Sequence, residues 1–217
     1  MNAIIFGAPG SGKGTYSSRL QATLGLEVIA MGDIFREMQK KDDIIGRIIK
    51  DYVGAGLLVP DIIVLEVLKE HIKKAPKGKG FILDGFPRNL VQADALEKIT
   101  KIDVVLDLIV PDWIIIERLS SRRICKDCGT VYNIRFLKPK VEGICDKCGG
   151  QLYLRNDDNP EVIKKRFELY QKETSPLIQY YKQKQVPFIA HTADKLVIPP
   201  DEIVNSFVKE IKKLNFA

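Results

Sequence analysis

A glycine-rich segment near the start of the chain has the residue types and spacing of a phosphate cradle. It runs from Gly7 to Thr15, as Gly-Ala-Pro-Gly-Ser-Gly-Lys-Gly-Thr, and follows an apolar run at residues 3–6. Glycines permit positive φ angles and bring successive backbone N–H groups onto phosphate oxygens, while the helix that starts there points its positive end at the same anion. Lys13 adds a full positive charge. The segment therefore predicts a nucleotide-phosphate site in preference to a ligand-free glycine turn.

A second candidate segment, residues 81–88, combines an acid with an arginine at the end of an apolar run. A buried strand that ends at Asp84 places its carboxylate at the carboxyl edge of a sheet, where α/β folds bind ligands. Asp84 is therefore a candidate for holding Mg²⁺ or its waters, and the alternative role is to cap the next turn. Pro87 fixes the turn before Arg88, so the guanidinium can bind a phosphate through two parallel hydrogen bonds.

All four cysteines lie in two close pairs with the spacing of metal ligands. Each pair can present two thiolates from a tight turn, and together they complete a tetrahedral set. Zn²⁺ fits this set best, and it should be structural because no coordination position is left for a reacting water. Iron and two dithiol redox motifs are the alternatives, and neither pair has the strand-to-helix context of a thioredoxin. The four cysteines are Cys125, Cys128, Cys145 and Cys148.

The framework for these residues is indicated by short apolar runs that alternate with amphipathic stretches. This alternation predicts an α/β fold with a central parallel sheet flanked by helices. The predicted strands are residues 2–6, 27–30, 80–84, 104–109 and 186–191. Helices are expected from Asp112 to about Arg123, from Pro160 with Asp158 or Asn159 as its cap, and from residues 176 and 200.

Two stretches depart from the alternation and predict insertions on one core. Residues 30–59 belong to a helical stretch without a strand, whereas residues 121–158 contain the cysteines, several glycines and short β-like pieces. We expect a core of residues 1–29, 60–120 and 159–217, carrying a helical insertion and a small β-rich lid. No internal repeat or low-complexity tract is found.

Composition is that of a globular protein. The chain has 217 residues, 45% of them hydrophobic and 29% charged, which is enough to form a hydrophobic core without disulfides. The net charge of +6 suits either nucleic acid or a cleft for polyphosphates. No secretory signal and no membrane span are recognised, so a cytoplasmic protein that does not bind membranes is expected.

Nearly the whole chain resembles adenylate kinases with a zinc-containing lid. Each matching string is short, and their order and spacing together make the resemblance specific. Besides the segments at 7–15 and 81–88, the strings are Gly32-Asp33 with Arg36, residues 56–61 (Gly-Leu-Leu-Val-Pro-Asp), Gln92-Ala-Asp94, residues 118–123, Val131-Tyr132, residues 155–158 (Arg-Asn-Asp-Asp) and Arg166.

The resemblance implies a P-loop kinase that transfers a phosphoryl group reversibly from MgATP to AMP, giving two ADP. Lys13, Arg88, Arg122, Arg155 and Arg166 are implied to act on the transferred group, and Arg118 is implied to help enclose it. The implied ATP-binding residues are Gly10, Ser11, Gly12, Lys13, Gly14, Thr15, Arg118, Arg122, Val131 and Tyr132.

The helical insertion is implied to bind the monophosphate, with Arg36 and Arg88 on its phosphate and Gln92 on its adenine. Asp33 and Asp84 are implied to hydrogen-bond Mg²⁺-bound water, which suits an ion that keeps much of its water shell. The implied AMP-binding residues are Met31, Arg36, Leu58, Val59, Gly85, Arg88, Gln92, Arg155 and Arg166.

Met31 departs from the family, which usually has a hydroxyl residue there, close to the bound base. A thioether can pack on a purine but cannot donate a hydrogen bond. A kinase for another nucleoside monophosphate therefore stays open as an alternative. The four cysteines and the basic charge of the chain leave a second alternative, a zinc-ribbon nucleic-acid-binding ATPase, which the lack of aromatic and basic interleaving around the cysteines disfavours. We expect ATP, AMP and ADP as the partners, no nucleic acid, and a monomer.

Overall fold

Five parallel strands form the centre of the molecule in this computed structural model, which describes residues 1–76 and 78–215. Their order across the sheet is β2-β3-β1-β4-β8, and every neighbouring pair is parallel. The strands are β1 (Asn2–Phe6), β2 (Glu27–Ala30), β3 (Phe81–Asp84), β4 (Val104–Ile109) and β8 (Phe188–Thr192). The predicted α/β fold is therefore confirmed, with shifts of one or two residues at β3 and β8.

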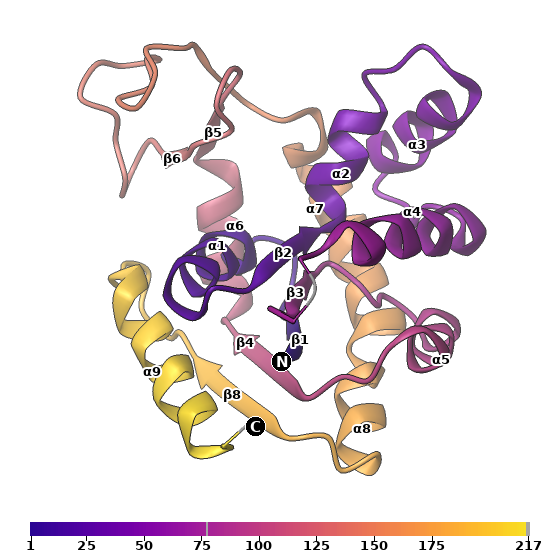
Figure 1. The fold of residues 1–217 in the computed structure, drawn as a ribbon. Coiled ribbons are helices and arrows are strands. Elements are labelled where there is room, and N and C mark those ends of the chain that lie inside the picture. The colour runs from indigo at the N-terminus through magenta and orange to yellow at the C-terminus, as the bar shows by residue number, and fades with distance from the viewer. Residues whose placement is uncertain (77, 216–217) are drawn as a thin grey trace.

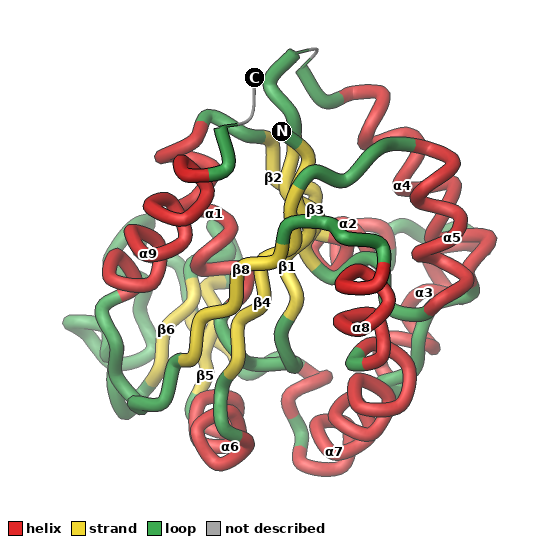
Figure 2. Tube along the Cα trace, turned by 90° about the horizontal axis from the view of Figure 1, so that it is seen from below, coloured by secondary structure: helices red, strands yellow, loops and turns green. Residues whose placement is uncertain are grey.

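Helices cover both faces of this sheet, as Figure 2 shows: α1 and α9 lie on one side, and α4, α5 and α8 lie on the other. The remaining elements surround the carboxyl ends of the strands (Figure 1). The helices are α1 (Lys13–Leu24), α2 (Met31–Met38), α3 (Ile44–Gly54), α4 (Asp61–Lys74), α5 (Leu90–Ile99), α6 (Asp112–Ser120), the short η1 (Asn156–Asp158), α7 (Pro160–Leu169), the π-helical η2 (Tyr170–Thr174), α8 (Pro176–Gln183) and α9 (Pro200–Lys213).

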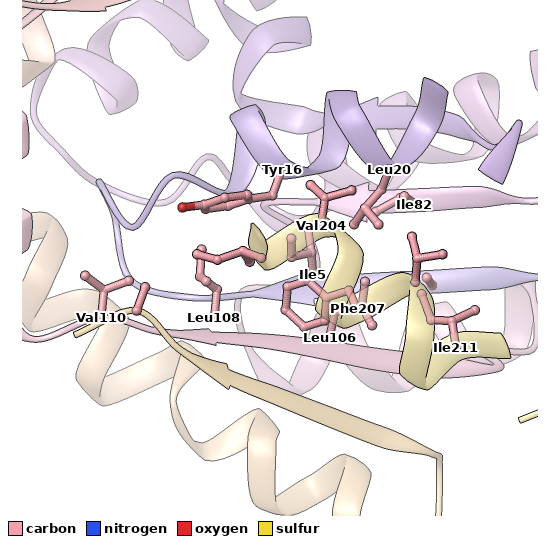
Figure 3. Packing of buried hydrophobic residues seen from close by; sticks show 14 of the residues in the cluster. Ile5, Tyr16, Leu20, Ile82, Leu106, Leu108, Val110, Val204, Phe207 and Ile211 are labelled. Carbon is pink, nitrogen blue, oxygen red and sulfur yellow. The ribbon is translucent and has the colours of Figure 1, made fainter. Parts of the chain in front are cut away.

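The core has two halves because successive side chains of a strand point to opposite faces. Figure 3 shows the half beneath α1 and α9, where Phe207 of α9 packs against Ile5 and Leu106. All three are at most 1% exposed. Burial of a side chain of this size contributes about 1.5–3 kcal/mol, so these contacts hold the strand that leads into the glycine-rich segment.

The other half of the core fixes the segment between β2 and α4. Met31 and Phe35 of α2 and Ile49 of α3 pack in the same cluster as Phe6 and Leu83, at the ends of two central strands. Helices α2 and α3 are thereby attached to the edge of the sheet where the candidate ligand residues lie. They occupy the expected helical insertion, and its independence as a unit stays a prediction.

A second, antiparallel sheet lies in residues 121–158, with the order β6-β5-β7. Its strands are β5 (Arg122–Cys125), β6 (Val131–Asn133) and β7 (Leu152–Tyr153). The helix predicted from Asp112 is present as α6, but its predicted end at about Arg123 is wrong, because α6 ends at Ser120. Arg122 and Arg123 pair instead with Asn133 and Tyr132 of β6, so strand pairing with a distant segment overrides the local helical pattern.

The other helix starts follow the sequence signals closely. Asn159, not Asp158, caps α7: its Oδ1 accepts a hydrogen bond of 2.9 Å from the backbone N–H of Val162, and Pro160 follows in the first turn. Pro111 takes the cap position of α6, and Asp112 is the first helical residue. Across residues 1–76 and 78–215, every helix is too short or too polar to traverse a bilayer.

Candidate active site

The glycine-rich segment joins β1 to α1 and gives Lys13 a fixed place. Gly10 has φ 86° and lies so close to α6 that a Cβ there would come within 2.5 Å of Leu119 Cγ, so no larger residue fits. The Lys13 Nζ donates hydrogen bonds to the carbonyls of Gly7, at 2.5 Å, and Ala8, at 2.9 Å. The ammonium therefore reaches back across the turn, where the loop encloses a phosphate in other P-loop proteins.

Burial sets the protonation behaviour of Lys13 and of the acid beside it. It lowers the pKa of Lys13 to about 8, and the charge of Asp84 opposes this effect. Burial also raises the pKa of Asp84, against the opposing charge of Lys13 and a 3.3 Å hydrogen bond from Ser17. An anion entering this site would favour the charged ammonium, so phosphate binding and protonation of Lys13 are coupled.

Five arginines gather around the same end of the sheet. Burial, and the charges of the other arginines, lower the pKa of Arg88 and of Arg155 to about 10. Burial lowers the pKa of Arg166 as well. Such crowding of cations is unfavourable without an anion, and together with Lys13 they outnumber the acids around them. The set consists of Arg36, Arg88, Arg122, Arg155 and Arg166.

Two carboxylates for which the sequence predicted no role in the site hold two of these arginines. Asp158 has a side chain that is 0% exposed and accepts from Arg122 Nε at 2.8 Å and from its Nη2. Arg166 Nη1 donates to Asp157 Oδ2 at 2.9 Å and lies 3.7 Å from Asp158. The only signal in the sequence was a pair of acids that follows Arg155 after one intervening residue.

A narrow pocket beside Arg88 has a cavity volume of about 10 Å³, enough for a single water molecule, so it must widen to hold the base of a nucleotide. Five residues predicted to bind the monophosphate line it, and Phe35 and Val64 complete its apolar wall, which sequence reasoning missed. The lining residues are Phe35, Leu58, Val59, Val64, Gly85, Arg88 and Gln92. An apolar slot with a few polar groups is the usual form of a small-molecule site.

Local contacts fix the polar side of this pocket. Arg88 Nε donates to the carbonyl of Gly85 at 2.8 Å, and the carbonyl of Arg88 accepts from Thr174 Oγ1 at 2.8 Å. Gln92 is 1% exposed, and its Oε1 accepts from the backbone N–H of Arg88 at 2.8 Å. Thr174 lies in the π-helical turn η2, a type of turn frequent at functional sites.

Two buried polar atoms in this region have no hydrogen-bond partner among the described residues: Ser11 Oγ and Arg155 Nε. Both belong to residues expected to contact phosphate. Leaving such groups unpaired costs about 1–3 kcal/mol each, which a phosphate oxygen would offset. The donor set therefore fits a polyphosphate ligand.

The two acids expected to bind Mg²⁺ through water are near each other at this edge of the sheet. Asp84 ends β3, and Asp33 is close enough for its negative charge to contribute to the raised pKa of Asp84. Asp33 forms an exposed ion pair with Arg36. Carboxylates that reach Mg²⁺ through water fit the ion's preference for keeping its hydration.

Some predicted residues lie elsewhere or do something else. Arg118 donates to the carbonyls of Ser11, at 3.1 Å, and of Leu196, at 3.2 Å, so it joins the P-loop to the segment before α9. Met31 is fully buried in the core and does not line the described pocket. Val131 is 40% exposed on β6. Their contacts with nucleotide stay predictions.

The four cysteines converge in the small sheet. All four Sγ atoms lie within 4.8 Å of one another, with Cys125–Cys148 at 3.4 Å and Cys128–Cys145 at 3.6 Å. A tetrahedral zinc site with Zn–S bonds of about 2.3 Å requires sulfur separations of about 3.8 Å, so the cluster fits zinc.

The side chain of Tyr132, expected at ATP, also belongs to this cluster. It is 5% exposed, and its hydroxyl lies 3.4 Å from Cys145 Sγ and accepts from the backbone N–H of Asp146 at 2.7 Å. The cysteine cluster is thereby tied to β6, and through β6 to β5 and Arg122.

Comparison with known proteins agrees with this geometry. The sequence model of the family described as adenylate kinase matches residues 5–186. Adenylate kinase of Caldicellulosiruptor saccharolyticus is 46% identical over 211 residues, which cover 95% of this chain and 98% of the relative. Adenylate kinase of Bacillus subtilis is 44% identical, over 85% of this chain and 87% of the relative. Adenylate kinase of Archaeoglobus fulgidus is 42% identical, over 86% of this chain and 88% of the relative.

Proposed function

This chain belongs to the adenylate kinase family, and we propose that it catalyses reversible phosphoryl transfer from MgATP to AMP, yielding two ADP. The observation that carries the proposal is an arginine cluster that adjoins two distinct sites. One is the P-loop with Lys13, and the other is the apolar pocket beside Arg88 and Gln92. A phosphoryl group passing between two nucleotides needs this arrangement of cations.

Catalysis rests on positioning and electrostatics, since phosphoryl transfer needs no covalent nucleophile. The P-loop amides and Lys13 hold the phosphates of ATP, and Arg36 and Arg88 direct the phosphate of AMP toward them. Arg122, Arg155 and Arg166 stabilise the charge that develops on the transferred group. Asp157 and Asp158 keep two of these guanidinium groups in position before the nucleotides arrive.

Asp33 and Asp84 would hold the Mg²⁺ that accompanies ATP through its water ligands, and the ion would neutralise phosphate charge. Water must be kept from the transferred group, because otherwise ATP would be hydrolysed. We propose that the lid of residues 121–158 closes over the phosphates for this purpose and reopens to release product.

Zn²⁺ is proposed to be structural and bound by Cys125, Cys128, Cys145 and Cys148. The sulfur separations and the hydrogen bond of Tyr132 to the cluster support this role. Four thiolates leave no open position for substrate. We also propose that the enzyme acts as a cytoplasmic monomer on ATP, AMP and ADP, without nucleic acid. Sedimentation of the purified protein tests its oligomeric state.

A substrate panel tests the proposed reaction. Purified enzyme with MgATP is offered AMP, GMP, CMP and UMP in turn, and the nucleotide products are quantified. We expect ADP from AMP with the highest kcat/KM. A preference for another monophosphate would refute the AMP assignment but retain the phosphoryl-transfer chemistry, and release of free phosphate without ADP formation from AMP would refute the kinase.

A further inference from the structure

The orientation of the Gln92 side-chain amide is fixed by two partners of opposite character. Its Oε1 accepts from the backbone N–H of Arg88 at 2.8 Å, and its Nε2 donates to Asp61 Oδ1 at 2.7 Å. A backbone N–H can only donate and a carboxylate can only accept. The amide therefore has one permitted orientation of the two that rotation by 180° would interchange.

Asp61 is itself held in place for this task. It is the first residue of α4, and its Oδ1 also accepts from Asn89 Nδ2 at 3.1 Å. Asn89 caps α5, with its Oδ1 accepting from the backbone N–H of Gln92 at 2.8 Å. Two helices that are separate in sequence thus bring the carboxylate against the amide of Gln92, which lines the base pocket.

We infer that Asp61 determines purine specificity by preventing rotation of the Gln92 amide, so that adenine is accepted and bases with a carbonyl at C6 are disfavoured. The inference rests on the proposed function, in which Gln92 reads the base. After its two protein contacts, the amide retains one free N–H and one free lone pair for a ligand. Adenine presents an amino donor beside a ring-nitrogen acceptor, whereas hypoxanthine presents a carbonyl acceptor beside an N–H donor.

An unrestrained glutamine would serve both bases, because rotating the amide exchanges its donor and acceptor. In this protein the rotated amide would place Oε1 against the carboxylate of Asp61 and Nε2 against the N–H of Arg88. Both hydrogen bonds would be lost and like partial charges would meet. A buried polar group left in this state weakens binding by about tenfold or more.

IMP is the matched probe, since its hypoxanthine keeps the purine shape and reverses the donor and acceptor at this edge. The experiment measures kcat/KM for AMP and IMP, together with their dissociation constants, for wild type and Asp61→Asn. An asparagine can offer an amino group to the rotated Gln92, so the variant loses one of the two contacts that oppose rotation and keeps the one with the backbone N–H of Arg88. We therefore expect the preference for AMP over IMP to fall about tenfold.

Asn89→Ser is the matched control for loosening of the helix junction. Serine preserves the cap of α5 but removes the hydrogen bond to Asp61, while Gln92 keeps its carboxylate partner. The AMP-to-IMP ratio should stay within about twofold of wild type. Thermal unfolding verifies that the variants are folded, and Asp61→Ser replaces Asp61→Asn if the latter is not.

Failure of the amide lock and failure of the proposed reaction give different results in these measurements. A fall in the ratio for the Asp61 variant alone supports the amide lock. An unchanged ratio in a folded Asp61 variant, or an equal fall in Asn89→Ser, overturns the lock while AMP phosphorylation by wild type still stands. If wild type does not phosphorylate AMP, the proposed function fails and the inference fails with it.

Discussion

Replacing Asp158 tests whether the arginine cluster is organised by the protein before nucleotides bind. Its carboxylate is 0% exposed, and Arg122, whose side chain is 16% exposed, donates two hydrogen bonds to it. Hydrogen bonds to charged groups contribute about 1.5–3 kcal/mol and neutral ones about 0.5–1.5 kcal/mol. Asp158→Asn, which keeps the shape and removes the charge, should therefore lower the free energy of unfolding by about 1–3 kcal/mol.

Asp158→Ala should cost more, about 3–5 kcal/mol, because it leaves Arg122 buried without its acceptor. In both variants the guanidinium loses its fixed position, and a displacement of about 1 Å can reduce the rate about 100-fold. We expect kcat to fall about 10- to 100-fold in Asp158→Asn. Loss of a carboxylate also leaves the site more positive, so ADP should raise the melting temperature of Asp158→Asn more than that of wild type.

Urea unfolding gives the stability, steady-state kinetics give kcat, and thermal melts with and without ADP give the ligand effect. Glu142→Gln, which removes an exposed carboxylate from the same lid, is the control for charge alone. If both Asp158 variants unfold within about 0.5 kcal/mol of wild type and retain its kcat, the carboxylate does not organise the cluster, and the reasoning is refuted.

Four further predictions concern single groups. Arg88→Ala should lower kcat/KM for AMP at least about 10³-fold with little loss of stability, because it removes a cation aimed at the reacting phosphates; nearly unchanged kinetics would make Arg88 a structural turn residue. Cys128→Ser should release zinc and lower the melting temperature clearly, while kcat stays closer to its wild-type value, because the ion is structural. Metal analysis, thermal unfolding and steady-state kinetics measure these three effects. Burial lowers the pKa of Lys13 to about 8, so kcat/KM for ATP should fall as pH rises through about 8, when the neutral amine replaces the ammonium; a profile that stays level to about pH 10 would contradict this. Gln92→Ala should impair discrimination among monophosphates more than Met31→Thr, and the Met31 variant should stay active, because Met31 is buried in the core whereas Gln92 lines the pocket; kcat/KM for each monophosphate measures both.

The central sheet was predictable because its determinants are local. Short apolar runs between amphipathic stretches mark buried parallel strands, and the glycines and lysine after β1 define the P-loop without knowledge of distant residues. The end of α6 was not predictable in this way. Residues 122 and 123 continue a helical pattern, and only their pairing with β6, across the cysteine pair of residues 125–128, makes them a strand.

The charged residues of the candidate site, and those at the spacing of the family motifs, could be predicted from the sequence, whereas its apolar lining could not. Arginines and glycines at family spacing were found, but Phe35 and Val64 look like core residues of amphipathic helices, and nothing in the sequence indicates that they line a pocket. Asp61 and Asp158 were visible only as members of motifs. Their roles depend on distances to Gln92 and Arg122, which the packing of separate elements sets.

Direct transfer between two nucleotides is the central claim, and isotope labelling measures it. The enzyme is given ATP labelled in its γ-phosphate and AMP labelled in its base, so that ADP made from AMP can be separated by mass from ADP left by ATP. We expect the γ-label to be recovered in the β-phosphate of the ADP formed from AMP, with one such ADP for each ATP consumed. Recovery of the label as inorganic phosphate, with the labelled AMP unchanged, would contradict it.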